Sequence, residues 1–507
     1  MNFRAFLQKL EEVGEMKRVK EPVHWNIEAG ALGAMAINWD RGPALLLENV
    51  VDYPGQALLG GLFTGPGTMR GRPDRRAFWS RLAVGLGLKK TIDYESFMEA
   101  LLQRRNQPIP PLQVSTAPCK EVVQTGKDVD LLQLPIPLIH EGDGGRYGTA
   151  GIVIARDLLS LWNNWSINRW MVRDRDSLVL NILPDTDLAT IYSRYQGAGE
   201  AMPCCIAIGA PAAAYLASAT SLPTGVGEAE VAGGLGLEPI QLVKAKTNDL
   251  LVPADAEVVI EGEVSLERDI EGPCPEFVRV SEPSLKPVFK VKAITRRRDT
   301  IMPFVVEGIK ISDSMALRSI AISMELMNDW RRTMPPNMRL RWLGLPPELR
   351  LGLVIAAVYP THVGHNYRAI YFLLARKKKA WFDKVLLVDS DIPPMNLTEV
   401  YLDFAQKLRP WKGQGWWLEE MEYPLSPAAA WANDDELARG VGKVLVMDAC
   451  FPESWSRDDI KVKVSFETCF PEEVKQKAIE KVRQILGTEP VVYPIPPEWA
   501  RGPLLME

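Results

Sequence analysis

The chain contains 507 residues, of which 47% are hydrophobic and 24% are charged. This composition excludes a disordered or fibrous protein and predicts a globular chain of roughly two to four domains. The 59 Lys and Arg residues nearly balance the 64 Asp and Glu residues, and the net charge of −5 excludes the global basic field that a nucleic-acid partner would require.

Signals for export, membrane insertion and thiolate metal binding are missing from the sequence. The segment MNFRAFLQKLEEV lacks the apolar core of a signal peptide, and no apolar stretch reaches the ~18 residues of a membrane span. We therefore expect a cytoplasmic protein without a membrane partner. The six cysteines form no CxxC pair and only four histidines are present, so oxygen atoms are the default ligands of any metal.

Residues 1–110 predict an N-terminal α/β domain. Phe3, Phe6, Leu7 and Leu10 recur at helical spacing and Gly14 follows, which predicts an amphipathic helix. Apolar runs such as ALLLENV then alternate with Gly and Pro up to NQPIPPLQ, where we place the domain boundary.

Residues 111–310 predict a mainly β domain, because short runs such as TAGIVIARD, SLVLNIL, CCIAIGA and VFKVKAI are separated by turn residues. This pattern is typical of a barrel or split barrel with inserted helices. The segment SDSMALRSIAISMELMNDW predicts a helix within a linker of residues 311–340.

Residues 341–507 alternate between strand-like runs, such as KVLLVDSDI and KVLVMDA, and helical runs, such as LTEVYLDFAQKL and PEEVKQKAIEKVRQIL. Such alternation predicts a parallel sheet flanked by helices. The expected fold class of the whole chain is α/β, in the wider sense an α+β multidomain protein.

The segment ERDIEGPCPEFVRV at 267–280 places two carboxylates, Glu271 and Glu276, around Gly272, Pro273 and Pro275. Proline fixes φ and cannot donate a hydrogen bond, so we predict a rigid loop rather than a helix interior or a regular central strand. At a pocket, the two acids could divide acid and base duties. At the surface, they would be ordinary solvated charges.

Two upstream segments also carry polar groups that could form a site. LWNNWSINRWMVRD at 161–174 contains an amide, a hydroxyl and a guanidinium within six residues, although an exposed strand with a buried Trp would give the same pattern. In SATSLPTGVGEAEV at 218–231, two glycines allow close backbone approach and Glu228 supplies a hard oxygen. A tight surface loop is the alternative interpretation.

Taken in order, NWSINR, LPTGVGE, TNDLLVPADAEVVIEG and IEGPCPE resemble the UbiD family of decarboxylases, which use prenylated FMN. The resemblance covers most of the chain, including GDGGRYGTAG at 142–151 and KVLLVDSDI. It implies an N-terminal α/β domain, a central flavin-binding split β-barrel and a C-terminal α/β domain that helps to form homodimers or larger assemblies, up to a hexamer. It also implies a catalytic set in which Glu276 donates a proton after carbon dioxide leaves and Glu271 holds Arg169.

The resemblance further implies that the chain binds prenylated FMN, a divalent metal (Mn²⁺ or Mg²⁺) that bridges to the flavin phosphate, and K⁺. Asn164 and Glu228 match ligands of the divalent metal, and Lys384 matches a lysine that contacts the phosphate. The positions that match the potassium site are Trp165, Ala217, Ser218, Thr220 and Glu228. The positions expected around the flavin are Asn164, Trp165, Ser166, Ile167, Asn168, Arg169, Ser218, Ala219, Thr220, Glu228 and Lys384.

One departure from the family concerns the third ligand of the divalent metal, which is usually a histidine. This chain has no histidine between His140 and His362. Asp187 in LPDTDLATIY is the nearest replacement, and Asp185 is the second candidate. Alternatively, both acids only cap the start of a helix.

The leading functional expectation is reversible, non-oxidative decarboxylation of an aromatic, heteroaromatic or α,β-unsaturated carboxylic acid, with a flavin prenyltransferase as the cofactor supplier. Because the reaction is reversible in the family, carboxylation of an arene or phenolic compound is an alternative. A second class is an oxidoreductase that uses ordinary FMN, although no GxGxxG dinucleotide motif is evident. A third is a non-catalytic subunit of a carboxylase complex, which would have no need of Arg169 and both acids.

Overall fold

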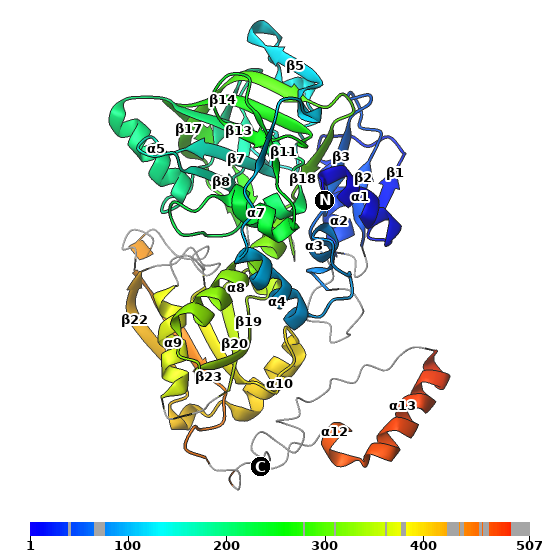
Figure 1. Cartoon of the computed structure of the whole chain (residues 1–507), viewed down its shortest axis with the longest axis vertical. Coiled ribbons are helices and arrows are strands. Elements are labelled where there is room, and N and C mark those ends of the chain that lie inside the picture. Colours follow the sequence, from blue (N-terminus) through cyan, green and yellow to red (C-terminus); the bar gives the residue numbers. More distant parts are fainter. Residues whose placement is uncertain are drawn as a thin grey trace. The chain divides into compact units, whose positions relative to one another are not determined.

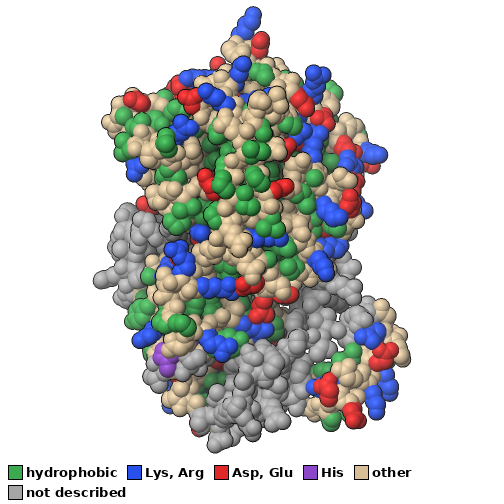
Figure 2. Space-filling view, in the orientation of Figure 1, with side chains coloured by type: hydrophobic (Ala, Val, Ile, Leu, Met, Phe, Trp, Pro, Cys, Tyr) green, Lys and Arg blue, Asp and Glu red, His purple; other side chains and the backbone are tan. Residues whose placement is uncertain are grey.

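The computed structural model describes residues 1–38, 42–64, 77–276, 279–308, 311–359, 362, 364–376, 382–422, 435–436, 441–455, 459 and 466–487. The chain forms two compact units, one of residues 1–67 and 75–325 and the other of residues 68–74 and 326–507 (Figure 1). None of the helices in the described ranges has both the length and the apolar content needed to cross a membrane. Figure 2 shows acidic and basic side chains interspersed over the visible face.

Helix α1 (Phe3–Glu12) confirms the predicted N-terminal helix. It begins at Asn2, whose side chain accepts a hydrogen bond from the backbone N–H of Ala5 at 2.9 Å. Its apolar side, including Phe3 and Phe6, is fully buried. The chain leaves the helix through Gly14, whose φ of 76° favours glycine.

A four-stranded sheet of order β1-β2-β3-β18 forms the N-terminal part of the first unit, with α1 and α2 beside it (Figure 1). Strand β18 comes from the far end of the region predicted as the central domain and pairs in parallel with β3. The strands are β1 (Met16–Val19), β2 (Ala44–Leu47), β3 (Ala57–Gly60) and β18 (Ile301–Phe304). The helices that follow α1 are α2 (Glu28–Asn38), α3 (Ser80–Gly85) and α4 (Tyr94–Arg105).

A nine-stranded sheet dominates the rest of the first unit, as the mainly β prediction requires. Its order is β6-β9-β10-β17-β14-β11-β7-β8, and β5 pairs with β17. The strands are β5 (Val122–Thr125), β6 (Tyr147–Gly148), β7 (Gly151–Arg156), β8 (Asn163–Ile167), β9 (Trp170–Val172), β10 (Ser177–Leu180), β11 (Met202–Ile208), β14 (Val258–Glu271) and β17 (Ser284–Arg296). The inserted helices are α5 (Asp187–Ala198), α6 (Ala212–Ser218) and α7 (Glu228–Gly236).

Two small sheets complete this unit. One has the order β13-β12-β4 and the other pairs β15 with β16. Their strands are β4 (Leu112–Val114), β12 (Gln241–Lys244), β13 (Leu251–Pro253), β15 (Cys274–Glu276) and β16 (Arg279–Ser281).

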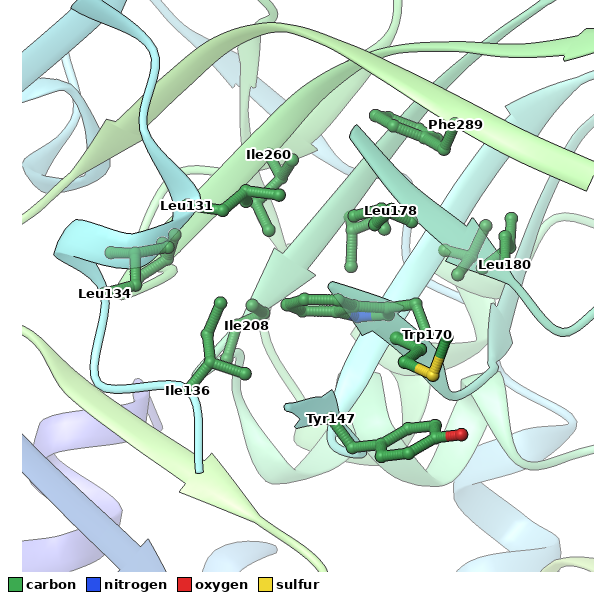
Figure 3. Close-up of a cluster of buried hydrophobic side chains, with 14 of the residues drawn as sticks. Leu131, Leu134, Ile136, Tyr147, Trp170, Leu178, Leu180, Ile208, Ile260 and Phe289 are labelled. Carbon is green, nitrogen blue, oxygen red and sulfur yellow. The ribbon is translucent and has the colours of Figure 1, made fainter. Parts of the chain in front are cut away.

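Buried hydrophobic side chains of the large sheet pack around Trp170, which is itself fully buried (Figure 3). Burying such an aromatic side chain is worth roughly 2–3 kcal/mol. Gly148 makes room for the indole, because a Cβ at this position would lie 2.0 Å from Trp170 Cζ2. The pairing of Gly148 with Trp170 in the β6–β9 ladder therefore depends on glycine.

The prediction of a rigid loop over 267–280 is wrong in part. Strand β14 continues to Glu271, which pairs with Ser284 of β17, so the first acid ends a long strand of the sheet. Strand formation is possible because the prolines begin only at Pro273, after the ladder has ended. Glu276 ends the short strand β15, where Pro275 lies opposite Val280 in a two-stranded sheet that tolerates a missing donor.

The second unit contains a five-stranded sheet of order β19-β20-β21-β23-β22. Strands β20, β21 and β23 are parallel, which confirms the predicted parallel arrangement, and β19 and β22 add antiparallel edges. The strands are β19 (Arg339–Gly344), β20 (Leu353–Tyr359), β21 (Lys384–Asp389), β22 (Gly415–Glu422) and β23 (Val441–Asp448). The helices are α9 (His365–Ala375), α10 (Leu397–Lys407), α12 (Phe466–Cys469) and α13 (Glu472–Leu486). The predicted linker helix is α8 (Asp313–Thr333), which begins in the first unit and ends in the second.

Candidate active site

Arg169 lies at a corner between two strands, after β8 ends at Ile167 and before β9 begins at Trp170. The backbone N–H of Asn181 donates to the carbonyl oxygen of Arg169 at 3.1 Å. The side-chain amide of Asn168 donates to the carbonyl oxygen of Asn181 at 3.1 Å, and Ser166 Oγ donates to Asn168 Oδ1 at 2.8 Å. These bonds fix the corner, so the guanidinium projects from a defined backbone position.

Arg169 and Glu271 form a bidentate pair. Nε of Arg169 lies 2.7 Å from Glu271 Oε1, and Nη2 lies 2.9 Å from Oε2. The Glu271 side chain is fully buried, and 15% of the Arg169 side chain is exposed. Burial works to lower the pKa of Arg169, but the hydrogen bonds and charge of Glu271 outweigh it and raise the pKa above its ordinary value. The guanidinium is therefore a permanent cation at this site.

Glu276 contacts the same guanidinium from another direction. Nη1 of Arg169 donates to Glu276 Oε1, and the Glu276 side chain is 34% exposed. The structure thus brings together all three residues of the expected catalytic set. Glu276 therefore reaches solvent, whereas the Glu271 carboxylate does not.

Two further residues contact this group, and no local sequence pattern indicates their roles. Tyr147 OH donates to Glu271 Oε1 at 3.0 Å. Ser281 Oγ accepts a long hydrogen bond of 3.5 Å from Nη2 of Arg169 and one of 3.2 Å from the backbone N–H of Cys274. Tyr147 lies in the segment GDGGRYGTAG, where neighbouring glycines were the only signal that could have drawn attention to it.

A second polar group lies where β8 meets the start of α7. Asn164 Nδ2 donates to Glu228 Oε1 at 3.2 Å, and the backbone N–H of Trp165 donates to Glu228 Oε2 at 2.9 Å. Burial raises the pKa of Glu228 to about 8, and the charge of Asp187 acts in the same direction. Asp187 therefore lies close enough to affect the Glu228 carboxylate.

This second group fits a cation. Asn164 is 4% exposed, and its Oδ1 atom has no hydrogen-bond partner among the described residues. A buried, unpartnered amide oxygen beside a buried carboxylate is costly unless a ligand satisfies it. Within the described ranges, no group of three or more His, Cys, Asp or Glu side chains is arranged to hold a metal ion, so a metal here would need the amide oxygen of Asn164 as well as carboxylates.

The two acids of LPDTDLATIY lie at the start of α5. Thr186 caps the helix by accepting a hydrogen bond from the N–H of Ala189 at 3.2 Å, and Asp187 is the first helical residue. Asp185 precedes the cap with a φ of 60°, in the left-handed region. The backbone thus agrees with the interpretation that both acids lie at the start of a helix. This position also allows Asp187 to contact a cation next to Glu228.

Of the residues expected around potassium, Ala217, Ser218 and Thr220 lie at or just after the end of α6. Trp165 lies in β8 and Glu228 begins α7, and α6 contacts both of these elements. Ser218 Oγ donates to Ala214 O at 2.8 Å, and Thr220 Oγ1 donates to Leu216 O at 2.7 Å. Each hydroxyl hydrogen is used in one of these bonds. The oxygen lone pairs of Ser218 and Thr220 therefore point away from the two carbonyl groups. Ala217 and Ser218 are the last two residues of α6, and Ala219 is the C-terminal cap of this helix.

The model of the 3-octaprenyl-4-hydroxybenzoate carboxy-lyase N-terminal domain, UbiD_N, matches residues 7–101, and the model of the Rift-related domain of the same carboxy-lyase, UbiD, matches residues 112–310. The pyrrole-2-carboxylic acid decarboxylase of Pseudomonas aeruginosa is 30% identical to this chain over 509 residues, which cover 95% of this chain and 97% of that protein. The chain belongs to the UbiD family.

Solved structures of UbiD-class enzymes share the fold. An evolved dimeric form of HmfF from Pelotomaculum thermopropionicum, in complex with prFMN, has a TM-score of 0.75 and 29% identity, and the match covers 91% of this chain and 98% of that one. Vanillic acid decarboxylase of Sedimentibacter hydroxybenzoicus has a TM-score of 0.80 and 26% identity, with coverage of 96% and 98%. The mixed α/β multidomain architecture of this chain is thus that of the UbiD class.

A small pocket of about 20 Å³ is lined by Ile167, two residues before Arg169. Its walls are mostly apolar, and the polar residues among them include Asp313 and Ser314. The segment after Val305 also approaches the acid pair, because a Cβ on Gly308 would lie 3.4 Å from Pro275 Cβ. A volume of this size holds about one water molecule and not an aromatic ring.

Lys384 begins β21 in the second unit, where it forms an ion pair with Asp383. The structure describes the two units separately, so the expected contact between Lys384 and a flavin phosphate stays a prediction.

Proposed function

We propose that this chain removes carbon dioxide from an aromatic or heteroaromatic carboxylic acid with the help of prenylated FMN. The observation that carries the proposal is the shared guanidinium: Arg169 holds the buried Glu271 with two nitrogen atoms and contacts the more exposed Glu276 with the third. In a member of the UbiD family, such a group supports substrate binding and proton transfer at one place.

The reaction leaves an electron pair on an sp² carbon, which no protein side chain can accept. That electron sink is the chemistry that prenylated FMN would supply when bound. The side chains of this chain would bind and orient the acid, limit access of water and deliver a proton.

Arg169 orients the carboxylate. A guanidinium has five N–H groups, and the contacts described above use four of them. One hydrogen on Nη1 therefore remains for the carboxylate of the substrate. Glu271 keeps the guanidinium plane fixed, because two parallel hydrogen bonds define its orientation.

Glu276 then acts as the proton donor. As the bond between the ring carbon and the carboxylate carbon breaks and carbon dioxide leaves, the carboxyl proton of Glu276 passes to that ring carbon. Glu276 becomes a carboxylate and regains a proton from solvent, which its partial exposure permits.

The cofactor ligands are proposed from the second polar group. Asn164 and Glu228 would hold Mn²⁺ or Mg²⁺ next to the flavin phosphate, with Asp187 as third ligand and Asp185 as the alternative. An all-oxygen set suits a hard divalent ion. The atoms that would hold K⁺ belong to Trp165, Ala217, Ser218, Thr220 and Glu228. Lys384 would add a charge to the phosphate site.

The aromatic or heteroaromatic substrate class is supported by the relatives of this chain. The substrates named for the two relatives, pyrrole-2-carboxylic acid and vanillic acid, are a heteroaromatic and an aromatic acid. The same class is therefore the first to test here.

The test is expression with and without a flavin prenyltransferase, followed by mass spectrometry of the bound flavin. Both preparations are then screened with a panel of aromatic and heteroaromatic acids for release of carbon dioxide, and with bicarbonate and the products for the reverse reaction. We expect prenylated FMN and turnover only after co-expression. Bound FMN with equal activity in both preparations, or no release from any acid, would refute the proposal. Light scattering of the same samples tests the expected homodimer or larger assembly.

A further inference from the structure

Tyr147 is placed next to the Arg169 corner by strand pairing. Strand β6 contains only Tyr147 and Gly148, and it pairs with β9, which begins directly after Arg169. Tyr147 lies opposite Met171, and Gly148 lies opposite Trp170. Figure 3 shows the ring of Tyr147 below Trp170, with its hydroxyl pointing away from Ile136 and Leu134.

The Tyr147 hydroxyl ends at the Glu271 carboxylate. It lies 3.0 Å from Glu271 Oε1, the oxygen that also accepts the hydrogen bond from Arg169 Nε. Tyr147 is fully buried, and burial together with the charge of Glu271 raises the pKa of Tyr147. The hydroxyl therefore keeps its proton and acts as a fixed donor.

The backbone around both residues is also fixed. The N–H of Gly144 donates to the carbonyl oxygen of Pro273 at 2.8 Å, and a Cβ on Gly144 would lie 2.1 Å from the carbonyl oxygen of Gly272. Arg146 stacks on the indole of Trp25, with 3.5 Å between its Cζ atom and the ring centroid. The segment that carries Tyr147 is therefore held against the chain that carries Glu271.

We propose that Tyr147 is a positioning residue for the decarboxylation reaction, a role that rests on the proposed function. Its hydroxyl holds the Glu271 carboxylate in the orientation that accepts two hydrogen bonds from Arg169. A Glu271 side chain that could rotate would release the guanidinium, and Arg169 would then present its remaining N–H to the substrate in a wrong direction. Tyr147 acts through Glu271 and Arg169 and does not itself touch the reacting atoms.

The test is Tyr147→Phe, which removes only the hydroxyl. The matched control is Tyr192→Phe, because Tyr192 is also buried and its hydroxyl donates to a neutral carbonyl, Ser265 O, at 2.8 Å. We expect Tyr147→Phe to retain flavin and to lose about tenfold or more in kcat, because a hydrogen bond to a charged group is lost. Its KM should change less than its kcat, since the contacts of the substrate ring are not altered. Tyr192→Phe should keep the wild-type kcat.

Three results would overturn the proposal. The first is a kcat of Tyr147→Phe within about twofold of the wild type. The second is an equal loss of kcat in the Tyr192→Phe control. The third is failure of Tyr147→Phe to fold. Failure of the proposed function itself is recognised separately, because the wild type would then release no carbon dioxide from any acid. The positioning role is in that case tested by a crystal structure of Tyr147→Phe. We expect the Glu271 carboxylate to rotate and lose one of its two hydrogen bonds to Arg169, and an unchanged pair would contradict the role.

Discussion

Arg169 and Glu271 are 102 positions apart in the sequence and are joined by two hydrogen bonds of 2.7 and 2.9 Å. One residue lies at the corner between β8 and β9, and the other ends β14. The sheet places them together because β9, β10, β17 and β14 are consecutive neighbours in it. The site therefore depends on the register of the sheet as much as on the two side chains.

Replacement of Arg169 by lysine tests whether the fork geometry matters. Lysine keeps the positive charge but cannot form two parallel hydrogen bonds with Glu271 and a third contact with Glu276. We expect a loss of decarboxylation of at least about tenfold, equivalent to roughly 1.4 kcal/mol in the barrier. Activity is measured as carbon dioxide release at saturating substrate.

The matched control for this substitution is Arg173→Lys. Arg173 also binds two carboxylates, those of Glu267 and Asp269, but at a more exposed position. It should keep near-normal activity, since exposed ion pairs contribute little. If Arg169→Lys were as active as Arg173→Lys, Arg169 would be only a structural residue.

Removal of single carboxylates tests the third metal ligand. Asp187→Ala removes the acid whose charge acts on Glu228, at a helical position that accepts alanine. Asp185→Gly removes its neighbour with a residue that suits a φ of 60°. We expect metal content, measured by elemental analysis, and flavin content to fall together in Asp187→Ala and to stay normal in Asp185→Gly.

Two other outcomes of that comparison would change the assignment. Full metal and flavin in Asp187→Ala would show that Asp187 is no ligand. Loss of both only in Asp185→Gly would assign the position to Asp185.

Asp313 gives a pH-dependent prediction at the wall of the pocket. Its buried carboxylate accepts hydrogen bonds from the backbone N–H groups of residues 62–64, at 2.6 to 3.1 Å. Burial raises its pKa from 3.8 to about 6, although these N–H groups and Arg81 oppose the shift. Because the folded state binds this proton more tightly than the unfolded state, the contribution of Asp313 to stability should be greatest below about pH 4 and fall as the pH rises to about 6.

Asp313→Asn cannot titrate and isolates this effect. The free energy of unfolding of the wild type, relative to this variant, should fall between pH 4 and pH 6 by up to about 3 kcal/mol and then stay level. Urea unfolding at several pH values measures it. A difference that stays constant with pH, or that grows as the pH rises, would contradict the prediction.

Local sequence patterns were sufficient for much of the fold. Helix α1, the linker helix α8 and the parallel strands of the second unit follow from hydrophobic periodicity. Periodicity could not indicate that β18 pairs with β3, because that pairing joins residues 301–304 to residues 57–60. Periodicity also failed to predict that Glu271 belongs to a strand, because Gly272 and Pro273 end the strand immediately afterwards.

The site was predictable where one short segment supplies several groups. Asn164, Asn168 and Arg169 lie in one such segment, and the two acids flank the proline-rich turn. Tyr147 was missed because its role comes from the β6–β9 pairing and from a hydrogen bond to a residue 124 positions away. A tyrosine among glycines has no local pattern that reveals such a contact.

The central claim is that Glu276 delivers the proton that replaces carbon dioxide, and its most direct test follows that proton. Glu276→Gln and the wild type, both loaded with prenylated FMN, are incubated with an accepted acid in D₂O. Glu267→Gln, at an exposed ion pair with Arg173, is the control. Deuterium at the carbon that carried the carboxylate is measured by NMR.

We expect one deuterium for each carbon dioxide released by the wild type and by Glu267→Gln. Glu276→Gln should retain its flavin but form the deuterated product roughly a hundredfold more slowly or not at all, because an amide fills the same space and cannot donate the proton. Formation of the deuterated product by Glu276→Gln at a near-normal rate would contradict the account.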